Sequence, residues 1–140
     1  MHEALKEARI AFEEGEVTVG AVIVKNNRII GRGHNRVEAL KDPTAHAEIL
    51  AITSAANTLG DWRLNDCTIY VTLEPCPMCA GAIWVARISR CVFGAYDPRI
   101  GGIVSKFKCC EDIEVKGGVL EREALELLQT FFKKLRDTAN

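Results

Sequence analysis

Apolar side chains recur along this chain at two spacings, and the change from one to the other marks the expected elements. Where they recur every three to four residues among Glu, Lys and Arg, the pattern indicates amphipathic helices. Four segments predict helices in this way: 3–14, 45–59, 77–88 and 121–136. Thr44 precedes the second segment as its expected N-cap, and Gly60 follows it as a stop.

Short runs of β-branched and apolar residues lie between these helices and predict strands. The first two, 17–24 and 29–31, are joined by a polar turn and are expected to form a hairpin. Three more runs follow: 68–73, 91–95 and a weaker one at 113–116. Because strands and helices alternate in the middle of the chain, these strands are expected to pair in parallel through right-handed crossovers. The order predicts an α/β fold in a single domain, residues 1–140.

Composition narrows the class of protein. Of the 140 residues, 48% are hydrophobic and 26% are charged, which is typical of a globular domain. No apolar run reaches the ~20 residues that cross a bilayer, and the N-terminus lacks a signal-peptide layout, so we expect a cytoplasmic protein with no membrane partner. The net charge of −1 provides no overall basic surface for nucleic acid, although a local patch on a dimer can be enough.

Two cysteines in the middle of the chain carry the first chemical signal. Cys76 and Cys79 stand where a predicted strand ends and a predicted helix begins, and Pro77 suits that helix start. A tight turn or first helical turn can bring both sulfurs to one cation. Alone, the pair could be a redox site, half of a zinc site, or chance. Six cysteines in a chain of this kind favour metal binding or buried thiols over a disulfide framework.

A zinc ion on these two thiolates needs a third protein ligand, and His46 is the best of the three histidines. His2 lies at the terminus and His34 near a strand end, whereas His46 begins a predicted helix, as Cys76 does. Three protein ligands leave a position for water, while a purely structural zinc knuckle takes four. Glu48 can then carry protons between that water and a leaving group. The order His-x-Glu, then Pro-Cys-x-x-Cys, is a known signature of zinc nucleobase deaminases.

Three segments carry a resemblance that runs from about Ala4 to Arg136. They are Pro43-Thr44-Ala45-His46-Ala47-Glu48, the run from Tyr70 to Ala82, and Val92-Phe93-Gly94-Ala95. In these segments the chain resembles the cytidine/deoxycytidylate deaminase superfamily and, more narrowly, the bacterial tRNA-specific adenosine deaminases, which convert the wobble adenosine of a tRNA anticodon to inosine. The resemblance implies a three-layer α/β/α sandwich with a five-stranded mixed sheet, a homodimer, and one Zn²⁺ per subunit.

The same resemblance implies roles for individual side chains. They are zinc ligands His46, Cys76 and Cys79, the proton shuttle Glu48, Asn35 against the flipped base, and Asp97 beside the RNA backbone. Two departures from the family pattern stand out. Thr18 replaces a usual proline, and the stretch 105–114 is short and lacks the usual Asn-His-Arg, with Cys109 and Cys110 in its place.

Three classes of function are compatible with these residues. The favoured one is deamination of a tRNA anticodon loop, and the alternative is a small-molecule nucleobase deaminase of the guanine or cytosine type. A non-enzymatic zinc-stabilised binding module is third, because Glu48 and the position left for water speak against it. Basic residues between Trp84 and Cys110 could be a local RNA-contacting face or a solvated loop: Arg87, Arg90, Arg99, Lys106 and Lys108.

Overall fold

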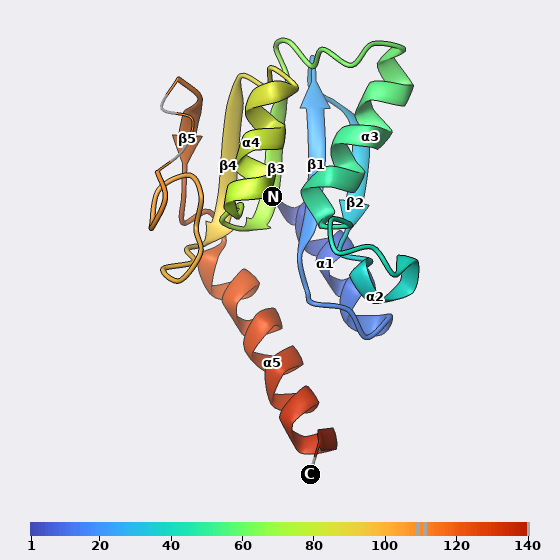
Figure 1. Ribbon diagram of the computed structural model, residues 1–140, viewed down its shortest axis with the longest axis vertical. Helices are drawn as coiled ribbons and strands as arrows, with labels where there is room; N and C mark the ends of the chain where they lie inside the picture. Colours follow the sequence, from blue (N-terminus) through green and yellow to red (C-terminus); the bar gives the residue numbers. More distant parts are fainter. Residues whose placement is uncertain (109, 111, 140) are drawn as a thin grey trace.

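The computed structural model describes residues 1–108, 110 and 112–139. Among them, one sheet contains the strands in the order β2-β1-β3-β4-β5 (Figure 1). Strand β1 pairs antiparallel with β2 and β3, whereas β3, β4 and β5 are parallel. The strands are β1 (Gly20–Lys25), β2 (Arg28–His34), β3 (Thr68–Leu73), β4 (Arg90–Ala95) and β5 (Glu114–Lys116). The hairpin and the parallel strands predicted from the sequence are therefore confirmed.

Helices cover both faces of the sheet, which confirms the three-layer α/β/α sandwich. Helices α1 and α5 pack on one face, and α3 and α4 on the other (Figure 1). The helices are α1 (His2–Glu13), α2 (Val37–Leu40), α3 (Ala47–Leu59), α4 (Pro77–Val85) and α5 (Glu121–Ala139). The C-terminal half of α5 projects past the sheet (Figure 1). In the described part of the chain, no helix has the length and apolar character needed to span a membrane.

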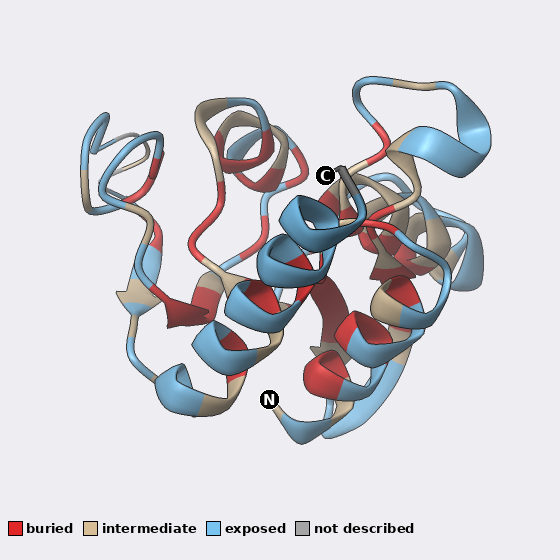
Figure 2. Cartoon of the chain, turned by 90° about the horizontal axis from the view of Figure 1, so that it is seen from below, coloured by how far each residue is buried: buried red, intermediate tan, exposed pale blue. Residues whose placement is uncertain are grey.

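The core lies between the sheet and its helices, because alternate strand residues point to opposite faces. Figure 2 shows the buried inner surfaces in red and the exposed outer faces of the helices in pale blue. Glycines permit the closest approach of the layers. A Cβ on Gly20 would lie 2.1 Å from the Ala4 carbonyl oxygen of α1, and a Cβ on Gly33 would lie 2.4 Å from that of Ala47 in α3.

Several element bounds differ from the sequence expectation, and one helix was missed. Thr44 is not the N-cap of α3, because its N–H and hydroxyl both donate to Asp42 Oδ1, and His46 takes the N-cap position. The helix expected over 77–88 ends at Val85, before Arg87 adopts a φ of 64°. The short helix α2 was not predicted, since four residues show no hydrophobic period. The stop at Gly60 is confirmed, with a φ of 68°.

Candidate metal centre and active site

One edge of the sheet collects the ends of three strands. Because β1 is antiparallel to β2 and β3, and β3 is parallel to β4, the chain leaves β2, β3 and β4 at the same edge. In open α/β sheets, ligands bind in the crevice outside the carboxyl ends of the strands. The residues that follow the three strands there include Asn35, Cys76 and Asp97.

Two helices begin at this edge and hold the candidate ligands. His46 is the N-cap of α3 and Cys76 the N-cap of α4, both with extended backbone, and Pro77 opens α4. Cys79 lies in the first turn of α4, on the same side as Cys76. Unpaired N–H groups at helix N-termini favour anions such as thiolates. The prediction that both halves of the site lie at helix N-termini of one edge is confirmed.

The three ligand atoms have the spacing of a metal shell. His46 Nδ1 lies 3.6 Å from Cys76 Sγ and 3.5 Å from Cys79 Sγ. Tetrahedral zinc with ordinary Zn–S and Zn–N bonds requires N···S separations of about 3.5 Å. Cys79 is buried, while His46 and Cys76 are half-buried. In the described part of the chain, these three residues form a group that could hold a metal ion, and its soft N/S donor set fits zinc.

Glu48 lies beside these ligands in the first turn of α3. Its side chain is 4% exposed and hydrogen-bonds with Cys79. Burial, the largest cause, raises the pKa of this carboxyl to about 7. A buried carboxyl that exchanges its proton near neutral pH is suited to proton transfer.

The two thiols shift each other's pKa in opposite directions. A hydrogen bond from Cys79 is the main cause that lowers the pKa of Cys76 to about 4, and His46 lowers it further. The same bond raises the pKa of Cys79, and the bond to Cys76 raises the pKa of His46. Cys76 therefore presents a thiolate, the form that binds metal.

Asn35 is buried at the same edge, with 7% of its surface exposed. Its N–H donates to the Val19 carbonyl, and the next N–H, of Arg36, donates to the Ala45 carbonyl. This second hydrogen bond joins the neighbour of Asn35 to the neighbour of His46, so it holds the two residues near each other. The intervening helix α2 is held by Glu16, whose buried carboxylate accepts the N–H groups of its first turn.

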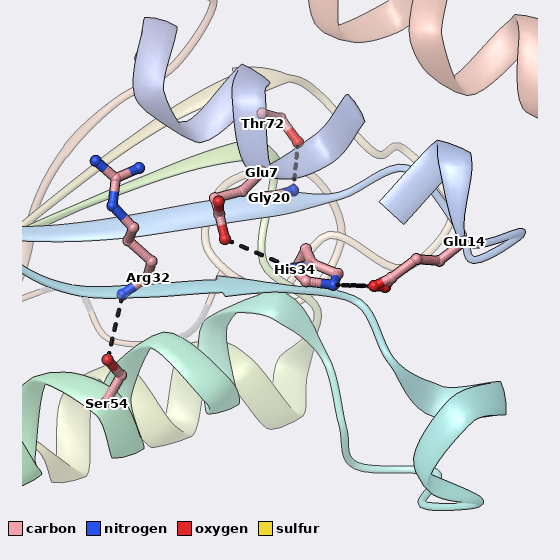
Figure 3. Close-up of polar contacts among 7 residues, drawn as sticks. All are labelled: Glu7, Glu14, Gly20, Arg32, His34, Ser54 and Thr72. Carbon is pink, nitrogen blue, oxygen red and sulfur yellow. Dashed lines mark hydrogen bonds and ion pairs between the residues drawn. The ribbon is translucent and has the colours of Figure 1, made fainter. Parts of the chain in front are cut away.

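His34 fixes the end of β2 just before Asn35, as Figure 3 shows. Its Nε2 lies 2.9 Å from Glu14 Oε1, and its Nδ1 lies 3.5 Å from Glu7 Oε1. Nearby, the Gly20 N–H donates to Thr72 Oγ1 at 3.1 Å and joins β1 to β3. Sequence reasoning placed His34 at a strand end but identified no partner for it, since Glu7 lies in α1 and Glu14 directly after it.

The carboxylate of Asp97 accepts hydrogen bonds from the loop that follows it. Its Oδ1 accepts the N–H of Arg99 at 3.2 Å and of Ile100 at 3.4 Å. Sequence reasoning missed Glu74, which is 2% exposed and hydrogen-bonds to the same loop. Burial acts to raise the pKa of Glu74, but hydrogen bonds from Ser105, Asp97 and Val104 together hold it below its usual value. An acid directly after a buried strand was the available signal.

The basic residues between Trp84 and Cys110 are spread over both ends of β4. Arg87 and Arg90 lie where β4 begins, and Arg99 and Lys106 lie beyond its other end, about 16 Å away for a six-residue strand. Arg87 stacks instead over the Trp62 ring, 5.3 Å from its centroid. Whether these bases contact RNA stays a prediction, with two of them at one end of β4 and two beyond its other end.

Among the described residues, the remaining cysteines and Thr18 lie outside the candidate metal site. Cys67 and Cys91 are buried, as predicted. Cys110 Sγ lies 3.3 Å from the Ala80 carbonyl oxygen, whereas Cys109 is outside the described residues. Thr18 is 1% exposed, and its hydroxyl has no hydrogen-bond partner within the described part of the chain.

Comparisons with known proteins agree with this geometry. The family model for MafB19-like deaminases matches residues 1–136. A tRNA-specific adenosine deaminase of Aquifex aeolicus is 51% identical, over 96% of this chain and 92% of its own length. The tRNA-specific adenosine deaminase of Bacillus subtilis is 48% identical, over 97% of this chain and 88% of its own length. A solved structure from a study of A-to-I editing by tRNA:A34 deaminases has a TM-score of 0.88 at 46% identity, covering 91% of this chain and 97% of that one. The chain is a deaminase, and it belongs to the family of tRNA-specific adenosine deaminases.

Proposed function

We propose that this chain is a cytoplasmic, single-domain, zinc-dependent hydrolase that converts the wobble adenosine of a tRNA anticodon to inosine. The observation that carries the proposal is the His46, Cys76 and Cys79 cluster with Glu48 buried against it. The names of the relatives support tRNA as the substrate. Their similarity extends over nearly the whole chain, so it includes the segments around the site.

The proposed roles follow from position. His46, Cys76 and Cys79 would hold one zinc ion, which supplies Lewis-acid activation of water when bound. Glu48 accepts a proton from the water that adds to the amine-bearing ring carbon, delivers it to the neighbouring ring nitrogen, and assists the departure of the amine as ammonia. Asn35 would orient the base, and the turn capped by Asp97 would lie beside the RNA backbone.

The first test separates the proton shuttle from the metal site. Glu48→Ala is expected to retain one zinc per chain and to lose about 10²-fold or more of the deamination rate. Glu121→Gln, on an exposed carboxylate in the first turn of α5, is the control and should keep full rate. A Glu48→Ala protein with full zinc and full rate would contradict the assignment.

The second test identifies the substrate. The zinc-loaded protein is incubated with a tRNA anticodon stem-loop, and separately with free guanine, cytosine and adenine. We expect inosine in the RNA and no turnover of free bases. Rapid conversion of guanine or cytosine without inosine would favour the small-molecule alternative and overturn the RNA proposal.

We also propose a homodimer. Trp84 and Val85 on α4 are 53% and 61% exposed, and Trp62 beside them is 50% exposed. They line a hollow of about 510 Å³ together with Ile113. Large exposed apolar side chains gathered in this way are typical of a protein interface. A second copy of the chain is the occupant that the family resemblance supports.

A further inference from the structure

Glu74 has an unusual set of partners for a carboxylate. Its side chain is 2% exposed, and it accepts backbone N–H groups from Asp97 at 3.0 Å, Val104 at 2.9 Å and Ser105 at 2.8 Å. The Ser105 hydroxyl donates to it as well. A buried carboxylate is costly unless it is paired or hydrogen-bonded. In the described part of the chain, Glu74 accepts its hydrogen bonds from one segment, residues 97–105.

The same segment presses against the turn that carries the candidate metal ligand. The Gly102 N–H donates to the Pro75 carbonyl at 2.7 Å. A Cβ on Gly102 would lie 2.6 Å from the Cys76 carbonyl carbon, and a Cβ on Gly101 would lie 2.4 Å from the Glu74 carboxylate. Only a glycine permits this approach. The segment 97–105 therefore packs closely against residues 74–77.

This segment has an inner and an outer side. Residues 101–103 are buried, while Arg99, Ile100 and Val104 are exposed. Hydrogen bonds within the segment hold its first turn, as at Asp97, but irregular backbone still samples many conformations unless a partner element restrains it. Glu74 supplies that restraint at both ends, because Asp97 begins the segment and Ser105 ends it.

We propose that Glu74 is a positioning residue that fixes the segment 97–105 against the metal-binding turn, so that Arg99 and Ile100 form a preformed wall for the RNA substrate. The inference rests on the proposed function for its substrate. It assigns Glu74 no contact with the reacting atoms. A rigid wall reduces the loss of conformational entropy on binding, so it strengthens binding more than it changes the chemical step.

The alternative is that Glu74 contributes only general stability. The two readings differ in where a substitution acts. Glu74→Gln keeps the shape but turns one acceptor oxygen into a donor that faces N–H groups. Glu16→Gln is the matched control, since Glu16 is also 2% exposed and accepts two backbone N–H groups, but from α2.

The experiment measures amide hydrogen exchange and steady-state kinetics on the zinc-loaded chain. In Glu74→Gln we expect the Asp97, Val104 and Ser105 amides to exchange on the order of tenfold faster or more, with core amides unchanged. KM for an anticodon stem-loop should rise on the order of tenfold, with kcat changed much less. Zinc content should stay at one per chain. Glu16→Gln should leave exchange in 97–105 unchanged.

A second variant approaches the same contact from the other side. Gly101→Ala places a methyl group into the Glu74 carboxylate and should produce the same local exchange and the same rise in KM. The variant with both substitutions should raise KM and amide exchange little more than the more severe single variant does. Both substitutions disrupt the same contact between Glu74 and the segment 97–105.

Uniformly faster exchange, or unchanged exchange at Val104 and Ser105, would overturn the proposal, as would a loss confined to kcat. If the wild-type chain forms no inosine, the proposed function fails, and the exchange data still decide whether Glu74 fixes the segment.

Discussion

At the scale of single residues, the chemistry rests on where protons reside among a few buried groups. His46 Nδ1 lies 3.6 Å from the sulfur of Cys76 and 3.5 Å from that of Cys79, and Glu48 is buried beside them. Each group alters the charge of its neighbours, so none of them has an ordinary pKa. Strongly perturbed groups clustered in this way are typical of a functional site.

Removal of the metal should expose Cys76 as a reactive thiolate. With its pKa lowered to about 4, Cys76 is a thiolate at every pH above about 5, so its alkylation by iodoacetamide should be nearly independent of pH between 6 and 8. Cys67 and Cys91 should stay unmodified, because burial raises the pKa of both thiols and blocks access.

Peptide mass spectrometry of the chelator-treated protein measures these rates. Reloading with zinc should slow the modification of Cys76 about tenfold or more, since the ligand is then occupied. A rate that rises tenfold per pH unit between 6 and 8 would indicate an ordinary thiol and contradict the prediction.

At the scale of elements, the site depends on how closely helices approach the sheet. Gly33 lies in β2 under the first turn of α3, where the nearest atoms are the Ala47 carbonyl oxygen and the Ala51 nitrogen. His46 precedes that turn and Asn35 follows that strand. The separation of β2 and α3 therefore sets the position of both residues.

Gly33→Ala should lower the free energy of unfolding by about 2–3 kcal/mol, because the added methyl group meets backbone atoms 2.4–2.6 Å away that cannot rotate aside. Gly81→Ala is the control. Gly81 lies in α4 with nothing within 4 Å of the position of a Cβ, so the change should stabilise by about 0.5–1 kcal/mol. Urea titration measures both, and equal effects at the two positions would contradict the packing argument.

At the scale of the whole molecule, the face of the sheet that α4 covers exposes large apolar side chains. On the α4 side, Trp84 and Val85 point outward, and the Trp84 Nε1–H donates to Asp112 at 3.2 Å. Trp62 adds an indole flanked by Arg63 and Arg87. This combination of aromatic and Arg side chains is enriched at interface centres.

Val85→Glu is expected to convert a dimer into a monomer at micromolar concentration, because it buries a carboxylate in the proposed interface. Ile10→Glu is the control: Ile10 is 39% exposed on α1, which covers the opposite face, and this variant should remain dimeric. Sedimentation velocity distinguishes the two masses. A wild-type chain that sediments as a monomer would contradict the homodimer.

The sequence by itself determined the order of helices and strands and the set of candidate metal ligands. Hydrophobic periodicity, prolines and glycines act on local structure. A short-range motif such as Cys76-x-x-Cys79 can therefore be recognised without tertiary contacts. The parallel pairing of the later strands followed from their alternation with helices, whereas the position of β1 between β2 and β3 came only from the tertiary structure.

Only the tertiary structure decided which distant groups meet. Glu74 and Ser105, or His34 and Glu14, are far apart in the chain, and no periodic pattern records their pairing. Arg87 and Arg99 are near in sequence, yet β4 separates them. Thr44 lost its expected capping role to His46 because Asp42 competes for its N–H and hydroxyl. Such contacts depend on how the chain folds back on itself, and they decide the shape of the site around its ligands.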